Sequence, residues 1–380
     1  MRLTQVKNLK DLHAFKAHVD ALAIDVPVDD VVAPDGVLGE PVSFTDGTAG
    51  TLQSPNRFAI LPMEGWDGSP EGRPTDLVRR RWERFGRSGC GLVWAEATAV
   101  RADGRANPSQ LLLDDTTLDD FAALRALLDP SQVAGLQLTH SGRYACAQPR
   151  IAYRHPILDA RVGADDANLL SDDELDELVA CYVDAAVRAR TAGFDFVDIK
   201  HCHGYLLHEL LSARDRPGRF GGDFEGRTRF LSSVVEGIRS RAPDLAIAVR
   251  LSAFDFVPFV AGDDNRGTPE WHGPYPHAFG GDGSGTGIDL REPHLLLDLL
   301  ASMGVRLVST TAGSPYYVPH VQRPAYFPPS DGYQPPEDPL VGVARQIHAT
   351  SEIKRRHPNL IIVGSAYSYL QEWLPYVGQA

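Results

Sequence analysis

The sequence contains little cysteine and methionine, with four cysteines and three methionines among its 380 residues. The cysteines are scattered along the chain, with no Cys-x-x-Cys pair and no cluster at metal-ligand spacing. They are Cys90, Cys146, Cys181 and Cys202. This distribution indicates reduced thiols, as is usual in a cytoplasmic protein.

Basic charge and long apolar runs are also scarce. The formal net charge is −13 and the pI is near 5.4, so nucleic acid and anionic membranes are poor electrostatic partners. No run of 18 apolar residues occurs, and the first 15 residues lack an apolar signal-peptide core. We therefore expect a cytoplasmic protein that binds neither membranes nor nucleic acid.

The chain does contain a regular alternation of two patterns. Seven short apolar runs have the length and β-branched content of buried parallel strands; they lie at residues 58–63, 91–100, 133–140, 194–201, 245–252, 305–310 and 360–365. Helical patterns separate them, at residues 75–88, 118–128, 171–193, 225–242, 289–303 and 337–357. The clearest helix has Ser171 and Glu174 as a capping box and Gly193 at its carboxyl end.

This alternation predicts an α/β fold with a parallel sheet, of the TIM (β/α)₈ barrel type. Residues 1–41 form an N-terminal extension, and residues 42–380 form the barrel domain. Two Pro- and Gly-containing inserts, 253–288 and 312–336, follow the fifth and sixth strands. They belong on the carboxyl face of the barrel, where active sites are built. The aromatic second insert, which includes Tyr316, favours a substrate wall or subunit contact over surface decoration.

Titratable side chains gather where the fourth strand ends, in the segment DIKHCHGYLLHELLSA (198–213). Lys200, His201, His203 and Tyr205 follow one another there and are expected to face the barrel mouth. A single histidine would be compatible with a purely structural role. Four polar residues at a strand end, followed closely by a helix, indicate a functional site.

The segment HGYLLHELLSARDRPGRFGGDFEGRTRF (203–230) resembles a block of the old yellow enzyme family, which includes 2,4-dienoyl-CoA reductase-like proteins. Further resemblances follow in chain order: NRFAILPME (56–64), GLVWAEATAV (91–100), GLQLTHSGRY (135–144), VRLSA (249–253) and IIVGS (361–365). The match is collinear from about residue 50 to residue 375.

The resemblance implies an FMN-dependent ene-reductase supplied with hydride by NADH or NADPH. Flavin contacts are implied for Pro62, Met63, Ala97, Gln137 and Arg250, and phosphate contacts for Gly364 and Ser365. Lys200 and His203 would hold the carbonyl oxygen of an unsaturated carbonyl or acyl substrate, and Tyr205 would protonate its α-carbon. Trp66, His201 and Tyr316 are expected to contact the substrate.

The sequence departs from the family pattern at three places. Lys200 stands where the family has the leading histidine of a pair, which suits an anionic substrate, and His201 is an alternative for that position. Glu64 stands where relatives carry a small or sulfur-containing residue, and it would lower the flavin potential or pair with Lys200. No eighth strand follows residue 365, so a missing chain segment, a partner chain or a homo-oligomer is expected to complete the barrel. As given, we expect the chain to bind FMN weakly and to associate, because apolar residues such as Ile60, Ile361 and Val363 lie at open edges.

Other interpretations remain open. Arg250 is alternatively a structural residue paired with Glu96. The whole chain is alternatively a flavin-free barrel that acts as a binding or scaffold subunit. A metal-dependent hydrolase using His201, His203 and His208 is a weaker possibility, because no carboxylate ligand is evident.

Overall fold

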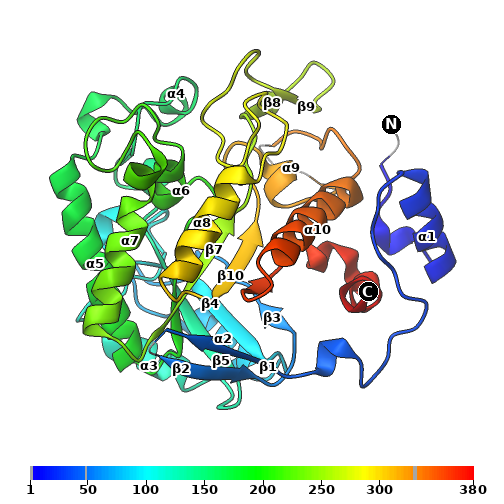
Figure 1. Ribbon diagram of the computed structural model, residues 1–380, viewed down its shortest axis with the longest axis horizontal. Helices are drawn as coiled ribbons and strands as arrows, with labels where there is room; N and C mark the ends of the chain where they lie inside the picture. Colours follow the sequence, from blue (N-terminus) through cyan, green and yellow to red (C-terminus); the bar gives the residue numbers. More distant parts are fainter. Residues whose placement is uncertain (1–2, 48, 328–331) are drawn as a thin grey trace.

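The computed structural model describes residues 3–47, 49–327 and 332–380. Its central sheet has seven strands in the order β11-β10-β7-β6-β5-β4-β3, and every neighbouring pair is parallel. The strands are β3 (Ala59–Ile60), β4 (Leu92–Ala99), β5 (Val133–Thr139), β6 (Phe196–Ile199), β7 (Ala246–Ser252), β10 (Leu307–Thr311) and β11 (Ile361–Val363). Six of them lie within the predicted apolar runs, and β10 extends one residue beyond its run, to Thr311. The predicted barrel-type α/β fold is confirmed (Figure 1).

A helix follows each of the first six barrel strands, as predicted. The six are α2 (Asp76–Gly86), α3 (Leu118–Arg125), α5 (Asp172–Thr191), α7 (Phe224–Arg241), α8 (Arg291–Ser302) and α10 (Pro339–Arg356). The capping box of α5 forms as expected: Ser171 Oγ accepts from the Glu174 backbone N–H, and the Glu174 carboxylate accepts from that of Ser171. Shorter helices are α4 (Leu158–Val162), α6 (Leu206–Leu211), α9 (Pro319–Gln322) and α11 (Leu374–Gln379).

An antiparallel hairpin closes the amino-terminal end of the barrel. Its strands are β1 (Val42–Asp46) and β2 (Gly50–Ser54), and Figure 1 draws them in dark blue below the barrel. Phe44 joins Trp94 and Phe196 in the apolar cluster inside the barrel. The buried Asp46 carboxylate accepts from Arg239 at 2.9 Å and from the Ile247 backbone N–H at 2.8 Å. The hairpin was not predicted, because its strands are short and only partly apolar.

The segment before the hairpin packs on the carboxyl-terminal part of the chain. Helix α1 (Leu12–Ala21) buries Phe15, whose ring stacks on Trp373 with centroids 5.4 Å apart. The surrounding apolar cluster also contains Leu340 and Val343 of α10 and Val377 of α11. In Figure 1, α1 accordingly lies beside α10 and the C-terminus.

The two edge strands of the central sheet, β3 and β11, are not paired with each other. The open edges expected from the sequence are therefore present. Ile60, Ile361 and Val363 are only partly accessible. Ile361 and Val363 pack against the cluster inside the barrel, and Ile60 packs against the outer core. Inward-facing side chains thus bury apolar surface even where strand pairing stops.

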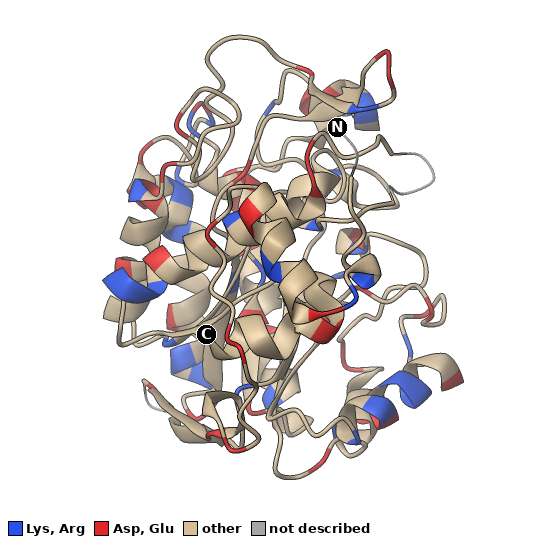
Figure 2. Cartoon of the chain, turned by 90° about the vertical axis from the view of Figure 1, so that its right-hand side faces the viewer, with Lys and Arg blue, Asp and Glu red and all other residues tan. Residues whose placement is uncertain are grey.

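The two inserts fold together above the carboxyl ends of the strands. The first contains a small hairpin, β8 (Phe259–Ala261) and β9 (Gly267–Pro269). The Phe259 backbone N–H donates to the Tyr317 carbonyl of the second insert at 2.8 Å, and that of Gly267 donates to the Gln334 carbonyl at 2.9 Å. Among the residues described, no helix is long and apolar enough to cross a membrane. Acidic and basic residues are interspersed over the helices facing the viewer in Figure 2.

We predict that the Phe15–Trp373 contact stabilises the packing of the N-terminal segment on the barrel. Phe15→Ala removes a fully buried ring, which typically costs about 3–5 kcal/mol. Compared with the native protein, we expect amide exchange to be faster in residues 3–26 and in α11, as measured by hydrogen–deuterium exchange. The exchange rates of β5 and β6 should change less. Leu77→Ala is the control, because Leu77 is 53% exposed. Equal exchange in both variants would contradict this packing.

Candidate active site

A buried carboxylate organises the inside of the barrel at the level of the carboxyl-terminal strand ends. Asp198 of β6 accepts hydrogen bonds from Trp94 Nε1 of β4 at 2.8 Å and from the Gln137 side-chain amide of β5. It also accepts from the Arg250 backbone N–H of β7 at 2.7 Å. Burial raises the pKa of Asp198 to about 6. Four consecutive barrel strands are therefore tied together at one residue.

Arg250 is a buried cation without a carboxylate partner. One guanidinium nitrogen donates to the Pro62 carbonyl at 2.7 Å, at the carboxyl end of the first barrel strand. Its Nε is buried and has no partner among the residues described. Burial lowers the pKa of Arg250, because the charged form is poorly solvated there. A guanidinium in this position can hold an anionic ligand.

The alternative that Arg250 pairs with Glu96 is wrong. Glu96 accepts from Arg81 at 2.8 Å and from Trp82 Nε1 at 2.8 Å, both on α2. The reason is an irregularity in β4, where the register shifts between Ala95 and Ala97. Glu96 therefore meets α2, on the outside of the barrel, whereas Ala97 pairs with Gln137 of β5.

Tyr205 is the centre of a hydrogen-bonded cluster of side chains from four loops. Its hydroxyl donates to the Glu64 carboxylate and lies 2.9 Å from the Tyr316 hydroxyl. Glu64 also accepts from Asn107 Nδ2 at 2.9 Å. The Tyr316 ring stacks on Tyr144 with centroids 3.9 Å apart. Burial, followed by the charge of Glu64, raises the pKa of Tyr205 well above its usual value.

Lys200 lies beside this cluster but makes no ion pair. Its Nζ is 3.7 Å from the centroid of the Tyr205 ring, a cation–π contact. The suggested pairing of Glu64 with Lys200 does not form. The Glu64 carboxylate is instead engaged by Tyr205 and Asn107. Burial lowers the pKa of Lys200.

The three histidines after β6, which are His201, His203 and His208, each have a different hydrogen-bond partner. His203 has φ = 67°, and its Nε2 lies 3.3 Å from Thr311 Oγ1. The His201 ring is bonded to the Ile199 carbonyl at 2.8 Å. His208 Nδ1 accepts from the Gly204 backbone N–H at 2.9 Å. In the part of the chain that is described, no group of three or more potential ligands could hold a metal ion.

The other residues singled out in the sequence lie at the strand ends around this cluster. Met63 and Trp66 are both 70% exposed and flank Glu64 in the loop after β3. Ser365 Oγ donates to the Thr310 carbonyl at 2.7 Å. The segment after Gly364 and Ser365 forms a 3₁₀ helix, Tyr367–Trp373, interrupted at Gln371. Its N-cap, Ala366, has a left-handed backbone with φ = 73°.

Comparison with known proteins now adds to this geometry. Residues 41–262, more than half of the chain, match the NADH:flavin oxidoreductase / NADH oxidase family. The chain belongs to this family. It is 30% identical over 259 residues to an NADH:flavin oxidoreductase of Gibberella zeae, covering 62% of each chain. It is 30% identical over 219 residues to an NADPH dehydrogenase of Bacillus subtilis, covering 56% of this chain and 64% of that protein.

A third relative of this flavin oxidoreductase family is a metal reductase of Desulforamulus reducens, 34% identical over 229 residues and matched over 33% of its length. The chain thus spans less than two thirds of each of these relatives. Solved structures have the same fold: morphinone reductase has a TM-score of 0.56 at 19% identity, covering 90% of this chain and 84% of its own. A 2-naphthoyl-CoA reductase complex has a TM-score of 0.61 at 15% identity, covering 86% of this chain and 46% of its own.

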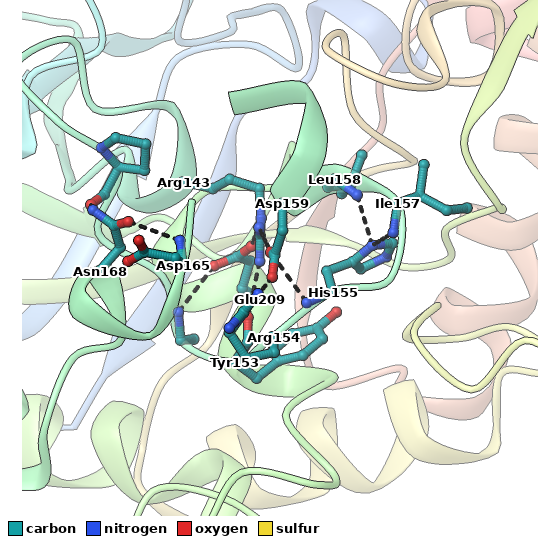
Figure 3. A network of polar contacts seen from close by, with 12 residues as sticks. Arg143, Tyr153, Arg154, His155, Ile157, Leu158, Asp159, Asp165, Asn168 and Glu209 are labelled. Atoms are coloured by element: carbon teal, nitrogen blue, oxygen red, sulfur yellow. Dashed lines mark hydrogen bonds and ion pairs between the residues drawn. The ribbon is translucent and has the colours of Figure 1, made fainter. Parts of the chain in front are cut away.

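In this flavin oxidoreductase family member, a buried ionic network anchors the loop that contains His203 and Tyr205. The Arg143 guanidinium donates to Glu209 of α6 and to Asp159 of α4 (Figure 3), and also to the Tyr153 carbonyl at 3.0 Å. Glu209 further accepts from the Ala152 backbone N–H at 3.2 Å. Removing one partner of such a network leaves a buried charge uncompensated, at about 3–5 kcal/mol. The network holds α6, and therefore the His203–Tyr205 loop, against the third barrel loop.

Asp255, in the first insert, is a site residue that sequence reasoning missed. It is fully buried, accepts from the Tyr317 hydroxyl of the second insert and from the Phe256 backbone N–H at 2.8 Å, and has no cationic partner in the described ranges. With Tyr275 and His208 it lines a small cavity of about 10 Å³ beside Gly204. Burial raises the pKa of Asp255 to about 7. No local pattern marks it, because the two inserts meet only in the folded chain.

The buried Asp255 predicts a pH-dependent stability. The pKa of Asp255 is higher in the folded than in the unfolded chain. Its contribution to the free energy of unfolding is therefore largest at acidic pH. That contribution is lost as the pH rises from about 4 towards 7. Asp255→Asn should gain stability relative to the native protein over this range, on the order of a few kcal/mol. Urea unfolding across the pH series measures the difference. A pH-independent difference would contradict the assignment.

Proposed function

We propose that this chain binds FMN and catalyses NAD(P)H-dependent reduction of an activated carbon–carbon double bond. The observation that carries the proposal is the buried guanidinium of Arg250, which forms no ion pair with a carboxylate in the described ranges. Arg250 lies on β7, and the phenol of Tyr205 follows β6, at the same barrel mouth. Membership of the flavin oxidoreductase family supports the cofactor class. The relative named NADPH dehydrogenase supports a nicotinamide as reductant.

The residues present fit a flavin ring. The unpartnered Nε of Arg250 offers positive charge where a reduced flavin carries negative charge. Gln137, on β5 and separated from Arg250 by β6, would offer its side-chain amide to the polar pyrimidine edge. Pro62, Met63 and Ala97 would contact the ring, and Gly364 and Ser365 would hold its phosphate. When bound, the flavin would accept hydride from the nicotinamide and pass it to the substrate.

The chain's own groups would handle the substrate and the proton. Lys200 and His203 would hold the substrate oxygen on which negative charge develops. Tyr205 would donate its hydroxyl proton to the α-carbon as general acid. Glu64 and Tyr316, both bonded to that hydroxyl, fix its position and supply a path by which the proton is replaced. Trp66 and His201 would contact the rest of the substrate.

A flavin-free binding or scaffold role is the alternative, and purification separates the two. Protein carrying the visible absorbance of flavin, released as FMN on heating, supports the proposal. Protein without flavin that takes up none from added FMN would overturn it.

Arg250→Ala should weaken FMN retention or slow its reduction by NAD(P)H. Loss of a hydrogen bond to a charged group costs about 1.5–3 kcal/mol, or roughly 10–150-fold in affinity. Fluorescence titration with FMN and stopped-flow reduction measure the two effects. Arg250→Lys keeps the charge and should lie between the variant and the native protein. An unchanged affinity and reduction rate in Arg250→Ala would sink the assignment.

Tyr205→Phe should slow reoxidation of the reduced enzyme by an alkene by about 10²–10⁴-fold, the usual contribution of a general acid. Reduction by NAD(P)H should change little. Tyr144→Phe is the matched control, since the Tyr144 hydroxyl is buried without a partner. If both half-reactions slow equally in Tyr205→Phe, the tyrosine only positions other groups.

A further inference from the structure

Lys200 is a second buried cation, and no anion among the described residues forms an ion pair with it. Its side chain follows β6 at the barrel mouth and is 4% exposed. The ammonium faces the Tyr205 ring at 3.7 Å and has no hydrogen bond or ion pair within the described ranges. An ammonium largely removed from water in this way is costly unless a negative charge joins it.

The nearby carboxylates are already engaged elsewhere. Glu64 accepts from Tyr205 and Asn107. Asp198 accepts from Trp94, Gln137 and the Arg250 backbone N–H. Neither forms an ion pair with Lys200, although both favour its charged form from a distance. The missing anion must therefore come from a molecule that enters the site.

The surroundings also indicate what the rest of that molecule is like. Met63 and Trp66, on either side of Glu64, are each 70% exposed, and Tyr316 is 39% exposed. Tyr316 extends an aromatic surface that continues into Tyr144. Accessible apolar and aromatic side chains around a buried cation favour a ligand with a flat apolar body and one anionic end.

We propose that Lys200 makes this site select substrates whose activating group is a carboxylate, attached to an apolar or aromatic body, over neutral carbonyl analogues. The inference rests on the proposed function for the identity of the site as a substrate site. The carboxylate accepts a hydrogen bond from the ammonium and neutralises it. A neutral carbonyl accepts the same bond but leaves the buried charge uncompensated.

The test compares trans-cinnamate with trans-cinnamamide, which share one skeleton and differ in charge. Isothermal calorimetry on the purified 380-residue protein at neutral pH should give about 10–100-fold tighter binding of cinnamate. Lys200→Gln should abolish this preference. Lys10→Gln, which removes an exposed lysine, should keep it. Equal affinities of the native protein for both probes, or an unchanged preference in Lys200→Gln, would overturn the proposal.

Thermal unfolding without ligand distinguishes this role from a packing role. Removal of an unpaired buried charge should leave the melting temperature of Lys200→Gln unchanged or raised. A clear drop would show that Lys200 supports the fold, and would overturn its assignment as a ligand-binding cation. Flavin content is measured on the same samples. If the protein prefers cinnamate but contains no flavin, the proposed function is rejected and this inference is kept. If the protein contains flavin but binds both probes equally, this inference is rejected and the proposed function is kept.

Discussion

The arrangement of this barrel mouth depends on one buried carboxylate. Asp198 receives hydrogen bonds from side chains of β4 and β5 and from the backbone of β7. Side-chain packing alone only loosely fixes how far parallel strands are shifted along one another. The hydrogen bonds to Asp198 add a specific constraint on that shift. The Asp198 carboxylate accepts its hydrogen bonds from Trp94, Gln137 and the Arg250 backbone. It therefore forms no ion pair with the Arg250 guanidinium. The same interaction thus fixes the position of Arg250 and leaves its charge available.

A second set of ions holds the loop that carries the proposed acid. Arg143, between Glu209 and Asp159, ties α6 to the third barrel loop and to α4. The loop itself contains a left-handed His203 followed by a left-handed Gly204, with φ of 67° and 77°. A non-glycine residue in that region is strained and persists only where its surroundings hold it. The ionic network on one side and Ser252 and Ser314, bonded to the His203 backbone, on the other provide that support.

The two inserts contribute more than a wall over the site. Tyr316 reaches the Tyr205 hydroxyl, whereas its neighbour Tyr317 turns to Asp255 of the first insert. Adjacent residues therefore connect the proposed acid to a buried carboxyl group with a strongly raised pKa.

The sequence by itself determined the order and type of the barrel elements. Apolar runs and amphipathic stretches are local properties, and each predicted strand and helix formed within a few residues of its expected bounds. It also identified the strand-end block around Tyr205, because function at a barrel mouth requires polar residues immediately after a strand. The β1–β2 hairpin escaped prediction, since its two strands gain their stability from covering the barrel end rather than from their own pattern.

Only the tertiary structure decided which charges pair. Glu96 was a candidate partner of Arg250, and Glu64 of Lys200, but a register shift in β4 sends Glu96 to Arg81, and the loop after β3 brings Glu64 to Tyr205. Ion pairs depend on distances of a few ångströms between segments far apart in the chain, and a sequence pattern contains no such distances. For the same reason the unpaired state of Arg250 and Lys200, on which both proposals rest, became visible only in the folded molecule.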